Sequence, residues 1–157
     1  MNNWFISNRD LIKNLAINTG TSNAPVYTTI CTTSEIAINT DLEEKDFYVF
    51  CDSLQRKIVT GASVNLSGTI KLDVNNAGVL DLLGDIHSLI ASGTIAQFNN
   101  KMIKFDLLTN VSSNTLTYTT YTANATLSLS DLGGSAEDES EFGFEMTLIG
   151  TATVASS

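Results

Sequence analysis

Residues 63–74, SVNLSGTIKLDV, alternate between apolar and polar side chains without a break. Every even position from Val64 to Val74 is apolar or glycine, and every odd position is Ser, Asn, Thr, Lys or Asp. Residues 142–154, FGFEMTLIGTATV, also place apolar or small residues at even positions. A period of two predicts long strands with one buried and one wet face. The solvent-facing sides of these strands carry few charged residues. We therefore expect the protein to be a building block of a larger assembly.

One amphipathic helix is predicted between these two strands, over about residues 79–91. Its apolar side chains fall on one helical face, and they are Val79, Leu82, Leu83, Ile86, Leu89 and Ile90. Asn75 or Asn76 is suited to cap the first turn, and Ser92-Gly93 is suited to end the helix with a left-handed residue. We therefore expect this helix to flank the sheet and to cover its open side.

The chain is predicted to be one folded domain preceded by an arm. Its 157 residues are 43% hydrophobic, with a mean hydropathy of +0.10, which is enough to bury a core. Residues 1–23 form the expected arm, with Trp4, Phe5 and a short helix that begins at Ser7 or Asn8 and carries Leu11, Ile12 and Leu15 on one face. The two aromatic residues could pack on the chain's own core or on a neighbouring subunit. Residues 24–157 are expected to form a single β domain.

Further strands and two acidic connections complete the expected layout. Alternation or β-forming composition predicts strands over residues 26–40, 47–51, 56–60 and 115–129, and a hairpin that pairs 95–98 with 102–108. A change of phase near Thr119-Thr120 indicates a bulge. The acidic connections are residues 41–46, DLEEKD, and residues 131–141, DLGGSAEDESE.

The charge of the chain excludes several classes of partner. Eight Lys and Arg residues against 17 Asp and Glu residues give a formal net charge of −9. An acidic surface repels phosphate groups, so we expect no specific nucleic-acid binding. No stretch approaches the roughly 20 apolar residues of a membrane span, and no secretory signal is visible. We expect synthesis in the cytoplasm, with Cys31 and Cys51 as reduced, buried residues of strands.

The sequence offers no catalytic, metal-binding or cofactor-binding constellation. His87 is the one histidine, whereas a zinc site or a catalytic triad needs partners. The acidic clusters 41–46 and 137–141 lack the ligand spacing of a calcium loop. We therefore expect neither an enzyme nor a bound cofactor.

The layout of residues 24–154 resembles the major tail proteins, or tail-tube proteins, of long-tailed bacteriophages. The resemblance lies in the β-rich segment 24–74, the single helix VLDLLGDIHSLIASG (79–93) and the closing strand EFGFEMTLIGTATV (141–154). It implies a β-sandwich or barrel with one flanking helix. It also implies rings, usually hexameric, that stack into the hollow tube of a virion tail. No catalytic residue exists in that family to be carried over.

The resemblance also implies partners and candidate surfaces. The expected partners are other copies of the chain, tail proteins such as the tape-measure and terminator proteins, and DNA as a passing cargo without sequence preference, with no membrane. The candidates for subunit contacts are Trp4, Phe5, Asp41, Glu43, Glu44, Asp46, Glu137, Asp138, Glu139 and Glu141. The candidates for a face toward the lumen are Ser63, Asn65, Ser67, Thr69 and Asp73, with the Thr-rich face of residues 115–129 as the alternative.

Other functions remain open at this point. A different virion component, such as a tail terminator, a baseplate part or a head decoration protein, would have a similar composition. A carbohydrate-binding β-sandwich is a further alternative. Formation of rings or tubes by the purified protein separates these hypotheses.

Overall fold

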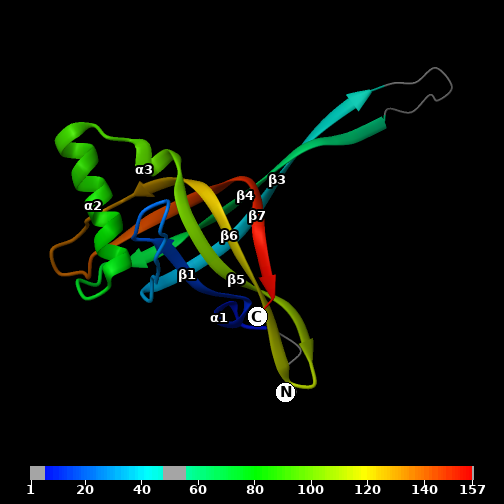
Figure 1. The fold of residues 1–157 in the computed structure, drawn as a ribbon, viewed down its shortest axis with the longest axis horizontal. Coiled ribbons are helices and arrows are strands. Elements are labelled where there is room, and N and C mark those ends of the chain that lie inside the picture. The colour runs from blue at the N-terminus through cyan, green and yellow to red at the C-terminus, as the bar shows by residue number, and fades with distance from the viewer. Residues whose placement is uncertain (1–5, 48–55, 157) are drawn as a thin grey trace.

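The computed structural model describes residues 6–47 and 56–156, and these form one antiparallel sheet with three helices (Figure 1). The sheet order is β2-β1-β5-β6-β7-β4-β3. The elements in chain order are α1 (Asn8–Leu11), β1 (Ile12–Asn18), β2 (Tyr27–Thr29), β3 (Thr33–Phe47), β4 (Arg56–Lys71), α2 (Ala77–Ser92), α3 (Ala96–Asn99), β5 (Lys101–Ser112), β6 (Thr115–Ser130) and β7 (Glu141–Ser156). The expected mainly β fold with a flanking helix is confirmed.

The sheet is curled into a barrel-like form because its two edge strands are neighbours in the sequence. β2 lies at one edge and β3 at the other, yet only residues 30–32 connect them. So short a link spans at most about 14 Å, which brings the edges together around the core. The largest fully buried side chains inside are Ile17, Leu66, Ile70, Val79, Leu82, Ile103, Phe142 and Met146.

The alternation that predicts the fold is confirmed in the middle of both long strands. In β4, Leu66 and Ile70 are fully buried. In β7, Met146 is fully buried and Phe142 is 1% exposed. The predicted ends differ. β4 stops at Lys71 rather than Val74, and the β7 alternation is interrupted at Gly150, which has a φ of 70°. There the register of β7 against β6 shifts, so two extra residues are accommodated as a bulge.

Helix α2 has the predicted caps but buries only half of the predicted stripe. The Asn76 side chain accepts hydrogen bonds from the backbone of Gly78 and Val79, and Gly93 ends the helix in the left-handed conformation. Val79 and Leu82 are buried in the core, whereas Ile90 is 78% exposed. The helix is longer than the body it covers, so its last turns extend beyond the sheet (Figure 1).

The short helix expected after Ser7 or Asn8 is confirmed at its start, because α1 begins at Asn8 with Ser7 at the N-cap position, but its extension to Ile12 and Leu15 is wrong. Helix α1 ends at Leu11, and Ile12–Asn18 is strand β1, which pairs with β5 on one side and β2 on the other. The open edge of β5 offers backbone partners, and Ile12, Leu15 and Ile17 fill the core. Asn14, with a φ of 57°, provides the irregularity that lets three consecutive residues, Leu15 to Ile17, be buried. The boundary at residue 23 stays a prediction.

Two further expectations are corrected. Residues 95–98 do not form a strand, because both edges of β5 are taken by β1 and β6; helix α3 covers this part instead. The bulge expected near Thr119-Thr120 lies on the facing strand, where the register shifts between Leu108 and Asn110.

Some predictions fall on residues outside the described ranges, and one cysteine was misplaced. The expected strand at 47–51 and the turn after it lie there, apart from Phe47, as do Trp4, Phe5 and Cys51.

Cys31 was expected inside a strand and buried, but it is exposed in the link between β2 and β3.

The sheet divides where β4 and β7 separate. β4 pairs with β7 only from Asn65 to Lys71, whereas its pairing with β3 continues to Arg56. Residues 40–47 and 56–64 therefore form a two-stranded projection, called the ribbon below. Figure 1 shows the ribbon leaving the body at the end away from α2, while β7 turns in another direction.

The pairing of β3 with β4 beside the register shift at Thr33–Glu35 requires a glycine at position 68. A Cβ atom there would overlap the carbonyl oxygen of Glu35 and lie 2.9 Å from the Cα atom of Ile36. We expect Gly68→Ala to lower the free energy of unfolding by about 1–3 kcal/mol, because the two strands must move apart.

Gly84→Ala is the matched control on α2, where an added Cβ has no atom within 4 Å. This change should raise stability by roughly 0.5–1 kcal/mol, because alanine favours helix. Urea denaturation of both variants checks the pair, and equal stability of the two would contradict the close approach of β3 and β4.

Candidate assembly surfaces

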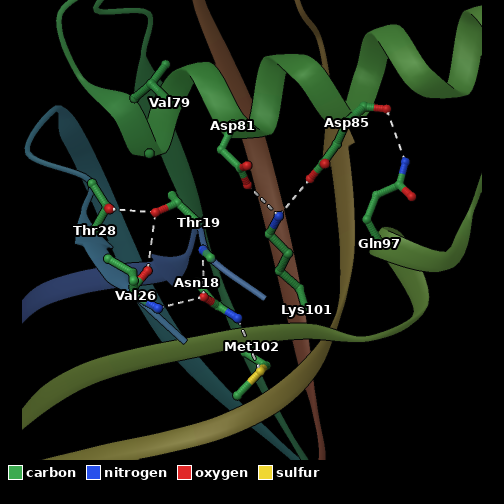
Figure 2. Close-up of polar contacts among 12 residues, drawn as sticks. Asn18, Thr19, Val26, Thr28, Val79, Asp81, Asp85, Gln97, Lys101 and Met102 are labelled. Atoms are coloured by element: carbon green, nitrogen blue, oxygen red, sulfur yellow. Dashed lines mark hydrogen bonds and ion pairs between the residues drawn. The ribbon is translucent and has the colours of Figure 1, made fainter. Parts of the chain in front are cut away.

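A buried lysine attaches helix α2 to the sheet (Figure 2). The Nζ atom of Lys101, at the start of β5, lies 2.7 Å from Asp81 Oδ2 and 2.9 Å from Asp85 Oδ2. Asp81 and Asp85 are one helical turn apart, so both carboxylates reach the same ammonium group. The Lys101 side chain is only 9% exposed. The contact holds the helix in one position on the body, and the sequence pattern of α2 gave no sign of it.

The ionisation of this cluster is perturbed in two ways. Burial raises the pKa of Asp85, and the hydrogen bond and charge of Lys101 only partly reverse the effect. Burial alone would lower the pKa of Lys101, but its hydrogen bonds to Asp81 and Asp85, with their charges, leave that pKa above 10.5. The cluster thus carries two acids against one base. We interpret it as structural, because its groups are engaged with one another.

A second polar group fixes the loop between β1 and β2 (Figure 2). The Oδ1 atom of Asn18 accepts hydrogen bonds from the backbone N–H groups of Gly20 (2.8 Å) and Val26 (2.9 Å). The hydroxyl groups of Thr19 and Thr28 lie 2.9 Å apart across the same loop. These contacts order the loop beside the start of α2.

The acidic residues expected in a connection at 41–46 lie on a strand instead. Asp41, Glu43, Glu44 and Asp46 belong to β3 within the ribbon, because β4 continues to offer backbone partners from Ser63 back to Arg56. All four are exposed, with Asp41 and Glu43 on one face of the strand and Glu44 and Asp46 on the other. Of these four, only Glu44 forms an ion pair within the described residues. Its carboxylate lies 4.0 Å from the ammonium group of Lys57.

The second acidic segment is a loop, as predicted, and lies far from the first. Residues 131–140 connect β6 to β7, and Glu137, Asp138 and Glu139 are exposed. Glu139 contacts Lys71 at 3.2 Å, and the backbone of Ser140 accepts from Leu72, so the loop is attached at the end of β4. Glu141 is the first residue of β7. About 50 Å of strand separates this end of β4 from its beginning at Arg56 in the ribbon.

Four of the five candidates for a lumen face share one surface. Ser63, Asn65, Ser67 and Thr69 are half-buried on the side of β4 opposite Leu66 and Ile70. Ser67 accepts a hydrogen bond from Asn39 at 3.3 Å, and the buried Oδ1 atom of Asn65 has no partner among the described residues. Asp73 lies beyond the strand, where its carboxylate accepts from the backbone of Asn75.

The structure shows surfaces that the sequence analysis missed. β7 beyond Thr147 has only β6 as a strand neighbour among the described residues, and its open side carries no charged residue. Large apolar side chains are exposed in the ribbon and on the second half of α2, including Leu42, Ile58, Val59, Leu89 and Ile90. The apolar stripe of α2 could have revealed this exposed surface from the sequence, because a stripe that is longer than the body it covers must continue into solvent.

The described ranges 6–47 and 56–156 also bear on small-molecule chemistry. No group of three or more His, Cys, Asp or Glu side chains converges there in a way that could hold a metal ion. His87 is exposed on α2. None of the helices in this part of the chain combines the length and apolar character that crossing a membrane requires.

Comparison with known proteins identifies the fold. No protein-family profile and no curated protein sequence matches the chain. A chain from the virion of a native gene transfer agent particle is 15% identical, with a TM-score of 0.54, and the match covers 90% of this chain and 95% of that one. A chain from the tail of an empty gene transfer agent particle with C6 symmetry is 14% identical (TM-score 0.54; 96% and 99% covered).

A third match comes from the sheath-tube complex of an extracellular contractile injection system in its extended state. That chain is 11% identical, with a TM-score of 0.55, and the match covers 98% of this chain and 93% of that one. At such low identity the matches show the fold. The fold is that of proteins found in phage-like tails and injection systems, and the tail-tube-like architecture expected from the sequence is confirmed.

Removal of the lysine that attaches α2 should destabilise the protein strongly. Lys101→Met leaves Asp81 and Asp85 without their counter-charge, and we expect a loss of about 3–5 kcal/mol in the free energy of unfolding. Lys104→Met is the matched control, because Lys104 lies on the same strand, has no ion pair within the described residues, and places its Nζ atom 5.7 Å from the centre of the Tyr27 ring. Urea denaturation measures both, and the double variant Lys101→Met/Asp85→Asn should recover part of the loss. Equal losses for the two lysines would contradict the role of the cluster.

Stability should also fall at alkaline pH through the same group. The pKa of Lys101 is raised in the folded state, so its contribution is fully present below 10.5 and is lost as the pH rises through the folded-state value. The difference in unfolding free energy between the wild type and Lys101→Met should therefore stay constant up to about pH 10 and shrink as the pH rises above 10.5 toward about pH 12. A difference that stays constant over this whole range would show that the charge of the Lys101 ammonium group does not cause the stabilisation.

Proposed function

We propose that this chain is a structural virion protein that assembles with copies of itself into stacked, hexameric rings, which form the hollow tail tube through which DNA passes. It acts without catalysis. Its other partners in this role are tail proteins such as the tape-measure and terminator proteins, and its location is the virion tail.

The observation that carries the proposal is the set of open strand edges. The outer edge of β3, β4 from residue 56 to 64, and β7 beyond Thr147 each lack one strand neighbour among the described residues. Long open edges are templates for pairing with another chain, and a free monomer normally blocks them. Pairing between neighbouring copies satisfies these edges and closes a ring.

The positions of the surfaces favour a ring rather than a two-fold dimer. The ribbon projects from one end of the molecule, and α2 with the 131–140 loop lies at the other (Figure 1). Contacts that join different ends of two copies are heterologous, and they generate rings when the rotation closes. The acidic residues of the ribbon and of the loop are then available at separate contacts between copies.

The charge of the assembly suits the passage of DNA. Six copies would carry a formal charge of −54, which is six times −9. Phosphate groups gain no counterion release at an acidic wall, so DNA would not be retained. The face of Ser63, Asn65, Ser67 and Thr69 is polar and weakly charged, and we propose it for the lumen.

The structural comparisons support this function and also keep one alternative. One similar chain comes from a tail with C6 symmetry, which agrees with hexameric rings. Another comes from a six-fold symmetrised baseplate of the anti-feeding prophage; it is 14% identical, with a TM-score of 0.50, and the match covers 99% of this chain and 97% of that one. A baseplate component is therefore the second candidate.

Electron microscopy of the purified protein tests the proposal. At high concentration, negative staining should show rings or tubes, and a baseplate component alone should not form long tubes. Ile58→Lys places a charge on the exposed apolar surface of the ribbon, where Ile58 is 49% exposed, and should abolish tubes while circular dichroism shows a folded protein.

Ser22→Lys is the control, because Ser22 is exposed in the loop between β1 and β2 and lies outside the ribbon, α2 and the 131–140 loop. It should leave tube formation unchanged. A wild-type protein that remains monomeric at high concentration would refute the tube, and tubes formed equally well by Ile58→Lys would remove the ribbon from the contacts.

A further inference from the structure

An unassigned cavity of about 650 Å³ lies where the two edges of the curled sheet meet. α1 and β1 form one wall, and the link between β2 and β3 with the start of β3 forms the other. Its lining includes Ile12, Leu15, Ile30 and Ile36, which are also part of the core or packed against it. The rim is polar and includes Arg9 and Cys31.

The cavity has the properties of a binding site for bulky apolar groups. Its volume lies within the roughly 300–1,000 Å³ of pockets that bury drug-sized ligands, which is sufficient for a pair of aromatic side chains. Ile12, Leu15, Ile30 and Ile36 give its lining an apolar part, most of the other lining residues are polar, and the exposed Arg9 on its rim can place a guanidinium group against an aromatic face. No other part of the described chain fills it.

The chain has an aromatic pair without an assigned place. Trp4 is its single tryptophan, and Phe5 follows directly. Both precede Ile6, the first described residue, which is 37% exposed. Five residues thus lie outside the described chain at a point next to α1, and they include two of its largest apolar side chains.

We propose that this cavity receives Trp4 and Phe5 from a neighbouring copy of the same chain. The inference rests on the proposed self-assembly and names one of its contacts. Burial of such a pair removes a large apolar area from water at the centre of the contact, which is where binding energy is usually concentrated.

The backbone at the start of α1 favours a neighbouring copy over the same chain. Ser7 is extended, with a φ of −72° and a ψ of 154°, so the chain reaches α1 without reversing. Asn8 and Arg9 already line the cavity, and only Ile6 and Ser7 separate them from Phe5. A turn takes four residues, so a return into the same cavity would make the aromatic residues part of the turn.

The sequence makes a direct test possible, because Trp4 is the only tryptophan and Cys31 lies on the cavity rim. A thiol quenches indole emission only at contact. The donor variant is Cys31→Ser/Cys51→Ser, which keeps Trp4. The acceptor variant is Trp4→Phe/Cys51→Ser, which keeps the Cys31 thiol. The control variant adds Cys31→Ser to the acceptor, so the two differ in one sulfur atom.

The donor is assembled with an excess of acceptor or of control, and the emission of Trp4 is recorded. We expect a blue shift on assembly in both mixtures, and a loss of intensity with the acceptor relative to the control. Because no chain in these mixtures contains both Trp4 and Cys31, such a loss can arise only between copies.

Two outcomes would overturn the inference. One is equal emission in the two mixtures. The other is quenching within a single chain, seen when the Cys51→Ser variant, which keeps both Trp4 and Cys31, is diluted into an excess of control. Electron microscopy of the same samples separates this failure from that of the proposed function. Tubes without quenching between copies refute only the cavity contact, whereas absence of any assembly refutes both.

Discussion

The link of residues 30–32 is the constraint on which the architecture depends. It joins the two edge strands of the sheet, so the sheet cannot lie flat and must enclose its apolar face. The same curl places α1 and β1 opposite the start of β3 and leaves the cavity between them. Had the edges been joined by a long connection, the same strands could have formed an open sheet with its apolar face uncovered.

Closure of the barrel leaves helix α2 only partly covered. The first half of α2 contributes Val79 and Leu82 to the core, and the ion cluster of Lys101 holds the helix at one angle. Two acids with one base in a half-buried site contribute less to stability than apolar packing of the same volume would. Such a cluster does, however, fix one position for α2, whose apolar second half would otherwise have several ways to pack.

The fork between β4 and β7 leaves open strand edges beside an apolar core. Within the described residues, the ribbon and the end of β7 have backbone groups without strand partners. In the assembly that we propose, other copies of the chain pair with these edges, and the few charges on the face of Ser63, Asn65, Ser67 and Thr69 limit repulsion there, although the whole chain is acidic.

The sequence by itself determined the β class, the two long strands and the helix with both of its caps. These follow from local periodicity and from capping residues, which act over a few positions, whereas the tail-tube-like architecture was expected from a resemblance to a known family. Tertiary structure decided that residues 12–18 are a strand, that 41–46 continue β3, and that 96–99 are helical. In each case the outcome depended on whether a distant strand had a free edge. Strand pairing joins residues far apart in the chain, so no local pattern could reveal it, nor the cavity and the Lys101 cluster that the pairing creates.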